Sequence, residues 1–206
     1  MSNRTAQPSR SIAFEAHEGQ SYGSKPYTYH LEMAARNARD IFGLPVLEDV
    51  MWLHDSIEDT PLAPSELNAR GVEAVVIWTV YRMSGVGLRP VEKVLRAKLQ
   101  PLSHAGKYCD ALANLRESQH CNDHKRIKKY TNTVLALQQD LPTVERLERY
   151  ITDFRSVIGE LEDERRRLIE LSSDTDIDIY LAIVERVREL DDVLSDRAEF
   201  DKLIPS

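Results

Sequence analysis

The chain has 206 residues, of which 42% are apolar and 30% charged, and its formal net charge is −7. This composition is typical of a soluble globular protein with a buried core, and it excludes a disulfide-stapled mini-protein and a disordered chain. The polar N-terminus lacks the apolar stretch of a signal peptide, and no apolar run is long enough to span a membrane. We therefore expect a cytoplasmic protein with no membrane partner, in which Cys109 and Cys121 stay reduced.

Helical periodicity dominates the chain after residue 27, and no long segment alternates apolar and polar residues, which predicts an all-α fold. The first helix is expected to begin at Thr28, as its cap, and to end at Gly43. A second continuous helix is expected from Pro45 to Thr60, because Pro61 restrains the residue before it.

Shorter helical segments follow, separated by glycine or proline. We expect helices at 65–70, 72–83, 90–99, 106–118 and 125–139, with a loop at 84–90. Pro142 marks the end of this pattern, so residues 1–142 form the first predicted domain, a helical bundle.

The last part of the chain, 143–206, has apolar residues at three- and four-residue spacing, interrupted near Thr175, which with Asp178 resembles a capping box. We expect a C-terminal helical hairpin that folds back on the first domain or pairs with a second copy. It carries 18 acidic against 10 basic residues, a net of −8, which leaves 16 against 17 for 1–142. The acidic hairpin disfavours a nucleic-acid partner, whereas the near-neutral first domain can hold a phosphorylated small molecule.

Four ionisable side chains fall within six positions of the otherwise apolar second helix: His54, Asp55, Glu58 and Asp59. On a continuous helix His54 stacks with Glu58, and Asp55 stacks with Asp59, on neighbouring faces. Imidazole and carboxylate together form a ligand set suited to manganese, iron or zinc. The alternative interpretation is a solvated acidic helix end with one histidine beside it.

Two further residues, on other predicted helices, favour the metal interpretation. His30 lies near the start of the first helix, and Asp110 shares one helix face with Lys107 and Asn114. Each alone is more often a surface group or a satisfied core group. The order of histidine, histidine-aspartate and aspartate on three separate helices is a stronger pattern.

At these residues the sequence resembles the HD-domain metal phosphohydrolases, and within them the RelA/SpoT-type alarmone hydrolases, most nearly the small single-domain hydrolases of the metazoan SpoT homologue type. The likeness spans roughly residues 12 to 140. The segments that carry it are 17–20 (HEGQ), 25–30 (KPYTYH), 53–60 (LHDSIEDT), 101–103 (PLS) and 107–116 (KYCDALANLR).

The resemblance implies an HD-type helical bundle in which one divalent ion, usually Mn²⁺, is bound by four residues. These ligands are His30, His54, Asp55 and Asp110. The resemblance further implies that Glu58 and Asp59 handle the attacking water, that Asn114 contacts the substrate near its sugar, and that Lys107 faces a phosphate or supports the site. The implied reaction removes the 3′-pyrophosphate of guanosine tetra- or pentaphosphate and leaves GDP or GTP.

The chain also departs from the family pattern. The turn at 21–24 is shorter and lacks the family's arginine- and lysine-rich character, so Tyr22 and Lys25 become the candidates for contacting the base and supplying a cation. Ala111 and Ala113 replace a basic and an aromatic or histidine residue, and Glu117 adds a negative charge.

These departures keep two alternatives open. The same site can act on another phosphorylated nucleotide, such as a deoxynucleoside triphosphate, a nucleoside monophosphate or the 2′-phosphate of NADPH. The bundle can also be a non-catalytic scaffold whose hairpin binds a partner. The complete set of acidic and imidazole groups argues against the scaffold, because a protein without catalysis has no need to keep all six.

Overall fold

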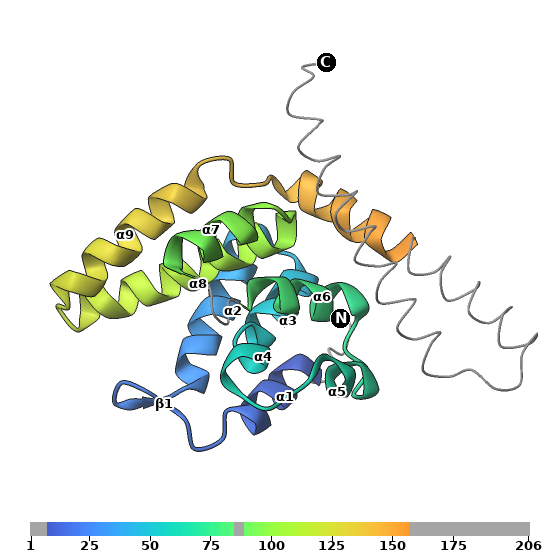
Figure 1. Cartoon of the computed structure of the whole chain (residues 1–206), viewed down its shortest axis with the longest axis horizontal. Coiled ribbons are helices and arrows are strands. Elements are labelled where there is room, and N and C mark those ends of the chain that lie inside the picture. The colour runs from blue at the N-terminus through green and yellow to red at the C-terminus, as the bar shows by residue number, and fades with distance from the viewer. Residues whose placement is uncertain (1–7, 85–88, 157–206) are drawn as a thin grey trace, which may run out of the picture. The chain divides into compact units, whose positions relative to one another are not determined.

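The structure is a computed structural model, and it describes residues 8–84 and 89–156 (Figure 1). All the long elements in these two ranges are helices, which confirms the predicted all-α fold. The chain divides into a compact unit at 1–144 and a second unit at 145–206. Of the second unit, residues 145–156 are helical, and most of the predicted hairpin lies outside the described residues.

The described elements of the first unit run in chain order as follows: α1 Pro8–Ala16, β1 Ser21–Tyr22, β2 Lys25–Pro26, α2 Thr28–Phe42, α3 Pro45–Leu53, α4 Ser56–Asp59, α5 Pro64–Ala69, α6 Ala74–Met83, α7 Pro90–Lys98, α8 Pro101–His120 and α9 His124–Gln138. The strands β1 and β2 form a small antiparallel ladder between α1 and α2. Neither α1 nor this ladder was predicted, because both are short and have weak periodicity.

Helix α2 begins at Thr28, but its N-cap is Tyr27 and not Thr28 as predicted. It ends at Gly43 as predicted, where the backbone adopts a left-handed conformation with φ of 67° and the Gly43 N–H donates to the carbonyls of Ala38 and Arg39. A left-handed residue without a Cβ carries no steric penalty, which is why glycine ends this helix.

The predicted continuous helix from Pro45 to Thr60 is wrong. Helix α3 ends at Leu53, α4 begins at Ser56, and a turn of two residues separates them. Successive side chains on a straight α-helix point about 100° apart. His54 and Asp55 both keep right-handed helical backbone angles, yet the imidazole Nε2 of His54 lies 3.0 Å from the carboxylate Oδ2 of Asp55.

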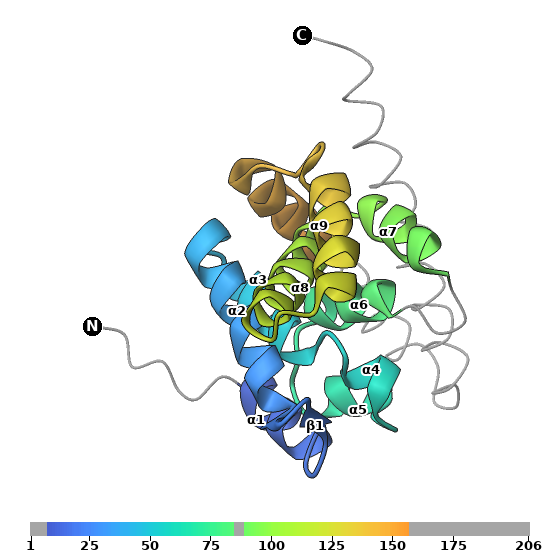
Figure 2. The same cartoon turned by 90° about the vertical axis from the view of Figure 1, so that its left-hand side faces the viewer.

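Helix α8 is the central element of the first unit, and it packs against α2, α3, α6, α7 and α9 (Figures 1 and 2). It begins at Pro101, five residues before the predicted start at Gly106, because the side chain of Gln100 caps it by accepting from the Ser103 N–H. A Cβ at Gly106 would lie 2.7 Å from the Met83 sulfur of α6. Glycine therefore permits the close approach of α6 to α8.

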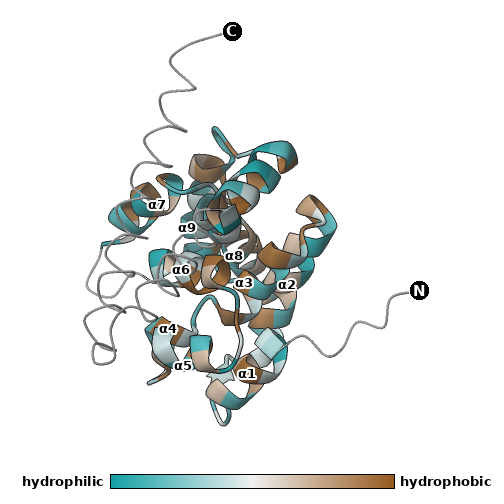
Figure 3. Cartoon of the chain, turned by 90° about the vertical axis from the view of Figure 1, so that its right-hand side faces the viewer, coloured by the Kyte–Doolittle hydropathy of each residue, from teal (hydrophilic) through white to brown (hydrophobic). Residues whose placement is uncertain are grey.

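The core of the first unit is made by the inward faces of these helices, and Figure 3 shows polar and apolar residues on different sides of the same ribbons. Fully buried aliphatic residues include Leu31, Leu47, Leu53 and Leu102. Within the described part of the chain, no helix has both the length and the apolar character needed to cross a membrane.

Candidate metal centre

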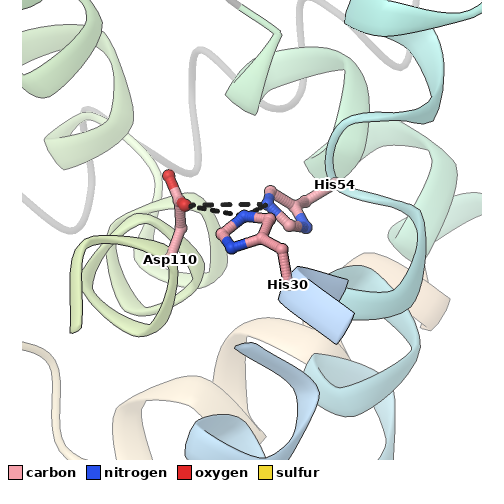
Figure 4. Close-up of side chains that lie close together, drawn as sticks. All are labelled: His30, His54 and Asp110. Carbon is pink, nitrogen blue, oxygen red and sulfur yellow. Dashed lines mark hydrogen bonds and ion pairs between the residues drawn. The ribbon is translucent and has the colours of Figure 1, made fainter. Parts of the chain in front are cut away.

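Four side chains from three places in the chain converge beside α8. His30 comes from α2, His54 and Asp55 from the turn between α3 and α4, and Asp110 from the middle of α8; Figure 4 shows His30, His54 and Asp110. The two imidazole Nε2 atoms lie 3.2 Å apart. The Oδ1 atom of Asp110 lies 3.3 Å from Nε2 of His30 and 3.7 Å from Nε2 of His54. The Oδ2 atom of Asp55 lies 3.6 Å from Nε2 of His30.

A hydrogen bond to the backbone fixes the orientation of the His54 imidazole. Its Nδ1 lies 2.9 Å from the carbonyl oxygen of Met51 and can only donate to it, which leaves the Nε2 lone pair facing the cluster. His30 also directs Nε2 inward, while its buried Nδ1 has no hydrogen-bond partner in the described structure. Two imidazole nitrogens and two carboxylate oxygens therefore face one another, and such a set of acceptors requires a cation or protons between them.

The charges of the metal-free cluster show the same requirement. Burial lowers the pKa of His54, but Asp55 and Asp110 outweigh it and raise that pKa to about 10. Burial raises the pKa of Asp110, but Lys107 and the two histidines outweigh it and hold the pKa well below its ordinary value. Both carboxylates stay ionised because positive charge is held between them, in the place a divalent ion would take.

These donor atoms fit a divalent metal ion. The ligand atoms of His30, His54 and Asp110 lie within 4.8 Å of one another, and all three residues are buried. Mixed nitrogen and oxygen donors of this kind suit transition metals rather than Ca²⁺ or Mg²⁺, which prefer oxygen ligands.

Two residues predicted to assist the site hold Asp110 on its own helix. Lys107 Nζ donates to Oδ2 of Asp110 at 2.8 Å, and Asn114 Nδ2 donates to Oδ1 at 2.6 Å. Burial lowers the pKa of Lys107, and Asp110, Asp55 and Glu58 outweigh it and raise the pKa above its usual range. Both carboxylate oxygens of Asp110 are thus oriented by neighbours on the same helix.

Tyr27 is a site residue that sequence reasoning did not single out. Its hydroxyl lies 2.7 Å from Oδ2 of Asp55 and 2.9 Å from Oδ2 of Asp59, and it can donate its one proton to either. Its ring stacks on His17, whose Nδ1 meets Oε1 of Gln20 at 2.8 Å. The residue lies within the 25–30 segment, but no spacing rule showed that its hydroxyl would reach two carboxylates.

The two residues predicted to handle water take different positions. Asp59 is exposed and joins the cluster through the Tyr27 hydroxyl. Glu58 forms an ion pair with Lys93 of α7, with Nζ 2.6 Å from Oε1. The structure therefore places the Asp59 carboxylate near Asp55, through Tyr27, and the Glu58 carboxylate beside the cation Lys93.

Tyr22 and Lys25, the two residues of 21–26 predicted to contact substrate, lie in different surroundings. The ring of Tyr22 stacks on His30, with ring centroids 4.8 Å apart, and its hydroxyl donates to Oδ1 of Asn114 at 3.0 Å. Lys25 instead pairs with Glu117 at 3.4 Å and lies over the ring of Tyr29. Lys25 therefore offsets the extra negative charge of Glu117.

Arg126 of α9 is a second site residue that the sequence did not reveal. One guanidinium nitrogen, Nη2, donates to Oδ1 of Asn114 at 3.1 Å and to the Tyr22 hydroxyl at 3.2 Å. The contact depends on α9 packing along α8, which the separation of twelve residues from Asn114 does not indicate. With Lys93 and Lys107, Arg126 adds positive charge around an otherwise acidic centre.

Compared with known proteins, the sequence matches no protein-family model and no curated protein.

Proposed function

We propose that this chain is a metal-dependent phosphohydrolase of the HD type, related to the RelA/SpoT-type alarmone hydrolases, with Mn²⁺ as its ion. The proposed reaction removes the 3′-pyrophosphate of guanosine tetra- or pentaphosphate. The observation that carries the proposal is the convergence of His30, His54, Asp55 and Asp110 beside an exposed carboxylate.

A divalent ion held by these four residues would lower the pKa of bound water and attract phosphoryl oxygens. The protein's own residues supply the rest. Asp59 is exposed, and its Oδ2 can accept a proton from the attacking water, while Tyr27 keeps that oxygen next to Asp55. A bond forms between the water oxygen and the phosphorus on the 3′ oxygen, the bond from that phosphorus to the 3′ oxygen breaks, and a proton passes to the 3′ oxygen.

The cations around the centre suit a substrate with several phosphate charges. Lys93 and Lys107 are each only partly exposed and are held by Glu58 and Asp110. Positive groups fixed in this way can stabilise charge on transferring phosphoryl oxygens without reorganising. In addition to the water-handling role that the resemblance implies, Glu58 holds the ammonium of Lys93 in place.

The test is to incubate the purified protein with Mn²⁺ and guanosine tetraphosphate and to measure GDP and pyrophosphate, with metal content determined on the same sample. We expect equal amounts of GDP and pyrophosphate from the wild-type protein and neither product from the Asp110→Ala variant. A protein with full metal occupancy and no turnover of this substrate would refute the proposed substrate.

A second candidate substrate class is favoured by the position of Tyr22. Its ring lies against His30, at the turn where the resembled family has basic residues for the guanine base. Another phosphorylated nucleotide, such as a deoxynucleoside triphosphate, a nucleoside monophosphate or NADPH, is therefore the alternative. A panel of these compounds under the same conditions separates the two by which product forms.

A further inference from the structure

Asn114 uses both ends of its side-chain amide for protein contacts. Its Nδ2 donates to the carboxylate Oδ1 of Asp110, and its Oδ1 accepts from Tyr22 and Arg126. The partner on one side is a carboxylate, which only accepts, and on the other a guanidinium, which only donates. The orientation of the amide is therefore fixed, and its side chain is buried.

The oxygen that Asn114 contacts is the one that faces the two histidines. Oδ1 of Asp110 lies within 3.7 Å of Nε2 in both His30 and His54, whereas Oδ2 is held by Lys107. A hydrogen bond to Oδ1 sets the rotation of the carboxylate and occupies one of its lone pairs. The other lone pair remains for the ion.

The two donors on the far side strengthen this bond. When the Tyr22 hydroxyl and the Arg126 guanidinium donate to the amide oxygen, they polarise the amide and make its N–H a better donor. Arg126 also donates to the Tyr22 hydroxyl, so the three residues form a closed triangle of hydrogen bonds. Tyr22 comes from β1 and Arg126 from α9, so the triangle joins two distant elements to one residue of α8.

We infer that Tyr22 and Arg126 are positioning residues that set the metal affinity through Asn114 and Asp110. This inference rests on the metal site of the proposed function and not on its substrate. It gives Asn114 a role in orienting a metal ligand, in place of the contact with the sugar that the resemblance implies. It also means that a group which draws Arg126 or Tyr22 away would weaken the hold on the ion.

The experiment measures binding of Mn²⁺ alone to the full chain, by the electron paramagnetic resonance signal of the free ion. We expect Asn114→Ala to weaken binding by about ten- to a hundredfold, as for other residues that orient metal ligands. Tyr22→Phe and Arg126→Met should each weaken it by about two- to tenfold, the equivalent of one hydrogen bond. Tyr22→Phe keeps the ring that stacks on His30.

The matched control is Tyr29→Phe, which removes a hydroxyl that donates to Glu117, also on α8, at 3.3 Å. It should leave Mn²⁺ affinity unchanged. In a double-mutant cycle, Tyr22→Phe should have no further effect once Asn114 is alanine, because the connection to Asp110 is already cut. Thermal unfolding in EDTA checks that each variant folds.

Two results would overturn the inference: equal effects of Tyr22→Phe and Tyr29→Phe, or an undiminished effect of Tyr22→Phe in the Asn114→Ala protein. If Asn114→Ala does not fold, the comparison of the two tyrosine variants decides alone. Failure of the wild-type chain to bind Mn²⁺ would refute the metal site and this inference together. Ion binding with the expected variant effects but no hydrolysis would refute only the proposed function.

Discussion

Metal binding should release a proton from His54, and this release can be measured. In the metal-free protein, burial lowers the pKa of His54, but Asp55 and Asp110 raise it to about 10. An ion needs the lone pair on Nε2, so binding must displace that proton. As the pH rises towards this pKa, the apparent association constant for Mn²⁺ should increase about tenfold for each pH unit. At pH 7 the affinity should therefore be about a thousandfold below its proton-free limit.

Isothermal titration with Mn²⁺ at pH 7, in two buffers of different ionisation enthalpy, counts the released protons. We expect about one proton for each bound ion, and a slope of the logarithm of affinity against pH close to one. His104→Gln is the control, because His104 is a buried histidine whose Nε2 contacts the carbonyl of Leu137. It should leave the slope unchanged. Binding without proton release at pH 7 would refute the reasoning, because it would mean that His54 is already neutral.

Three further predictions concern single residues. Asp110→Ala should abolish Mn²⁺ binding and hydrolysis together, whereas Glu58→Gln should keep the ion and lose most turnover. Metal analysis and product assays on each variant test this, and equal metal loss in both variants would show that Glu58 is a ligand. Tyr27→Phe removes the hydroxyl beside Asp59 and should reduce metal affinity or turnover by about tenfold or more, measured by the same assays. Because the pKa of His54 is raised in the folded protein, protonated His54 stabilises the metal-free fold, fully so below pH 6.5. Urea unfolding in EDTA should show that this stabilisation is lost as the pH rises through about 10. A free energy of unfolding that instead increases over this pH range would contradict the charge assignment.

Local patterns predicted much of the fold because their causes are local. Gly43 ends α2 through its own backbone conformation, and the spacing of apolar residues placed most of the helices to within a few residues. The face shared by Lys107, Asp110 and Asn114 followed from helical geometry alone, and both predicted neighbours contact Asp110.

The break between α3 and α4 could not be predicted in this way. The residues around it have good helical periodicity, and no glycine or proline interrupts them before Pro61. The turn lies at the centre itself, where the side chains of His54 and Asp55 are 3.0 Å apart. Tertiary contacts overrode local propensity here, as they commonly do at functional sites.

The contributions of Tyr27 and Arg126 were also missed for a tertiary reason. A tyrosine hydroxyl lies at the far end of a long side chain, so its partner depends on which element packs alongside. Tyr27 reaches residues about thirty positions away, and Arg126 reaches Tyr22 over more than a hundred. Such contacts follow from the packing of α2, α4, α8 and α9 rather than from any spacing in the sequence.

The two alanines that depart from the resembled family have a packing explanation. Ala111 belongs to a buried cluster with Val134 and Leu137 of α9, and Ala113 is completely buried. Larger side chains at either position would have to displace packed neighbours, so their small size follows from close packing around α8. They therefore carry little weight against a phosphate-binding pocket.

The departure that bears on substrate is the 21–24 turn, where Tyr22 lies against His30 and contacts Asn114. Any base bound at this turn must either stack beyond the tyrosine ring or displace it, and substrate choice depends on which of the two occurs.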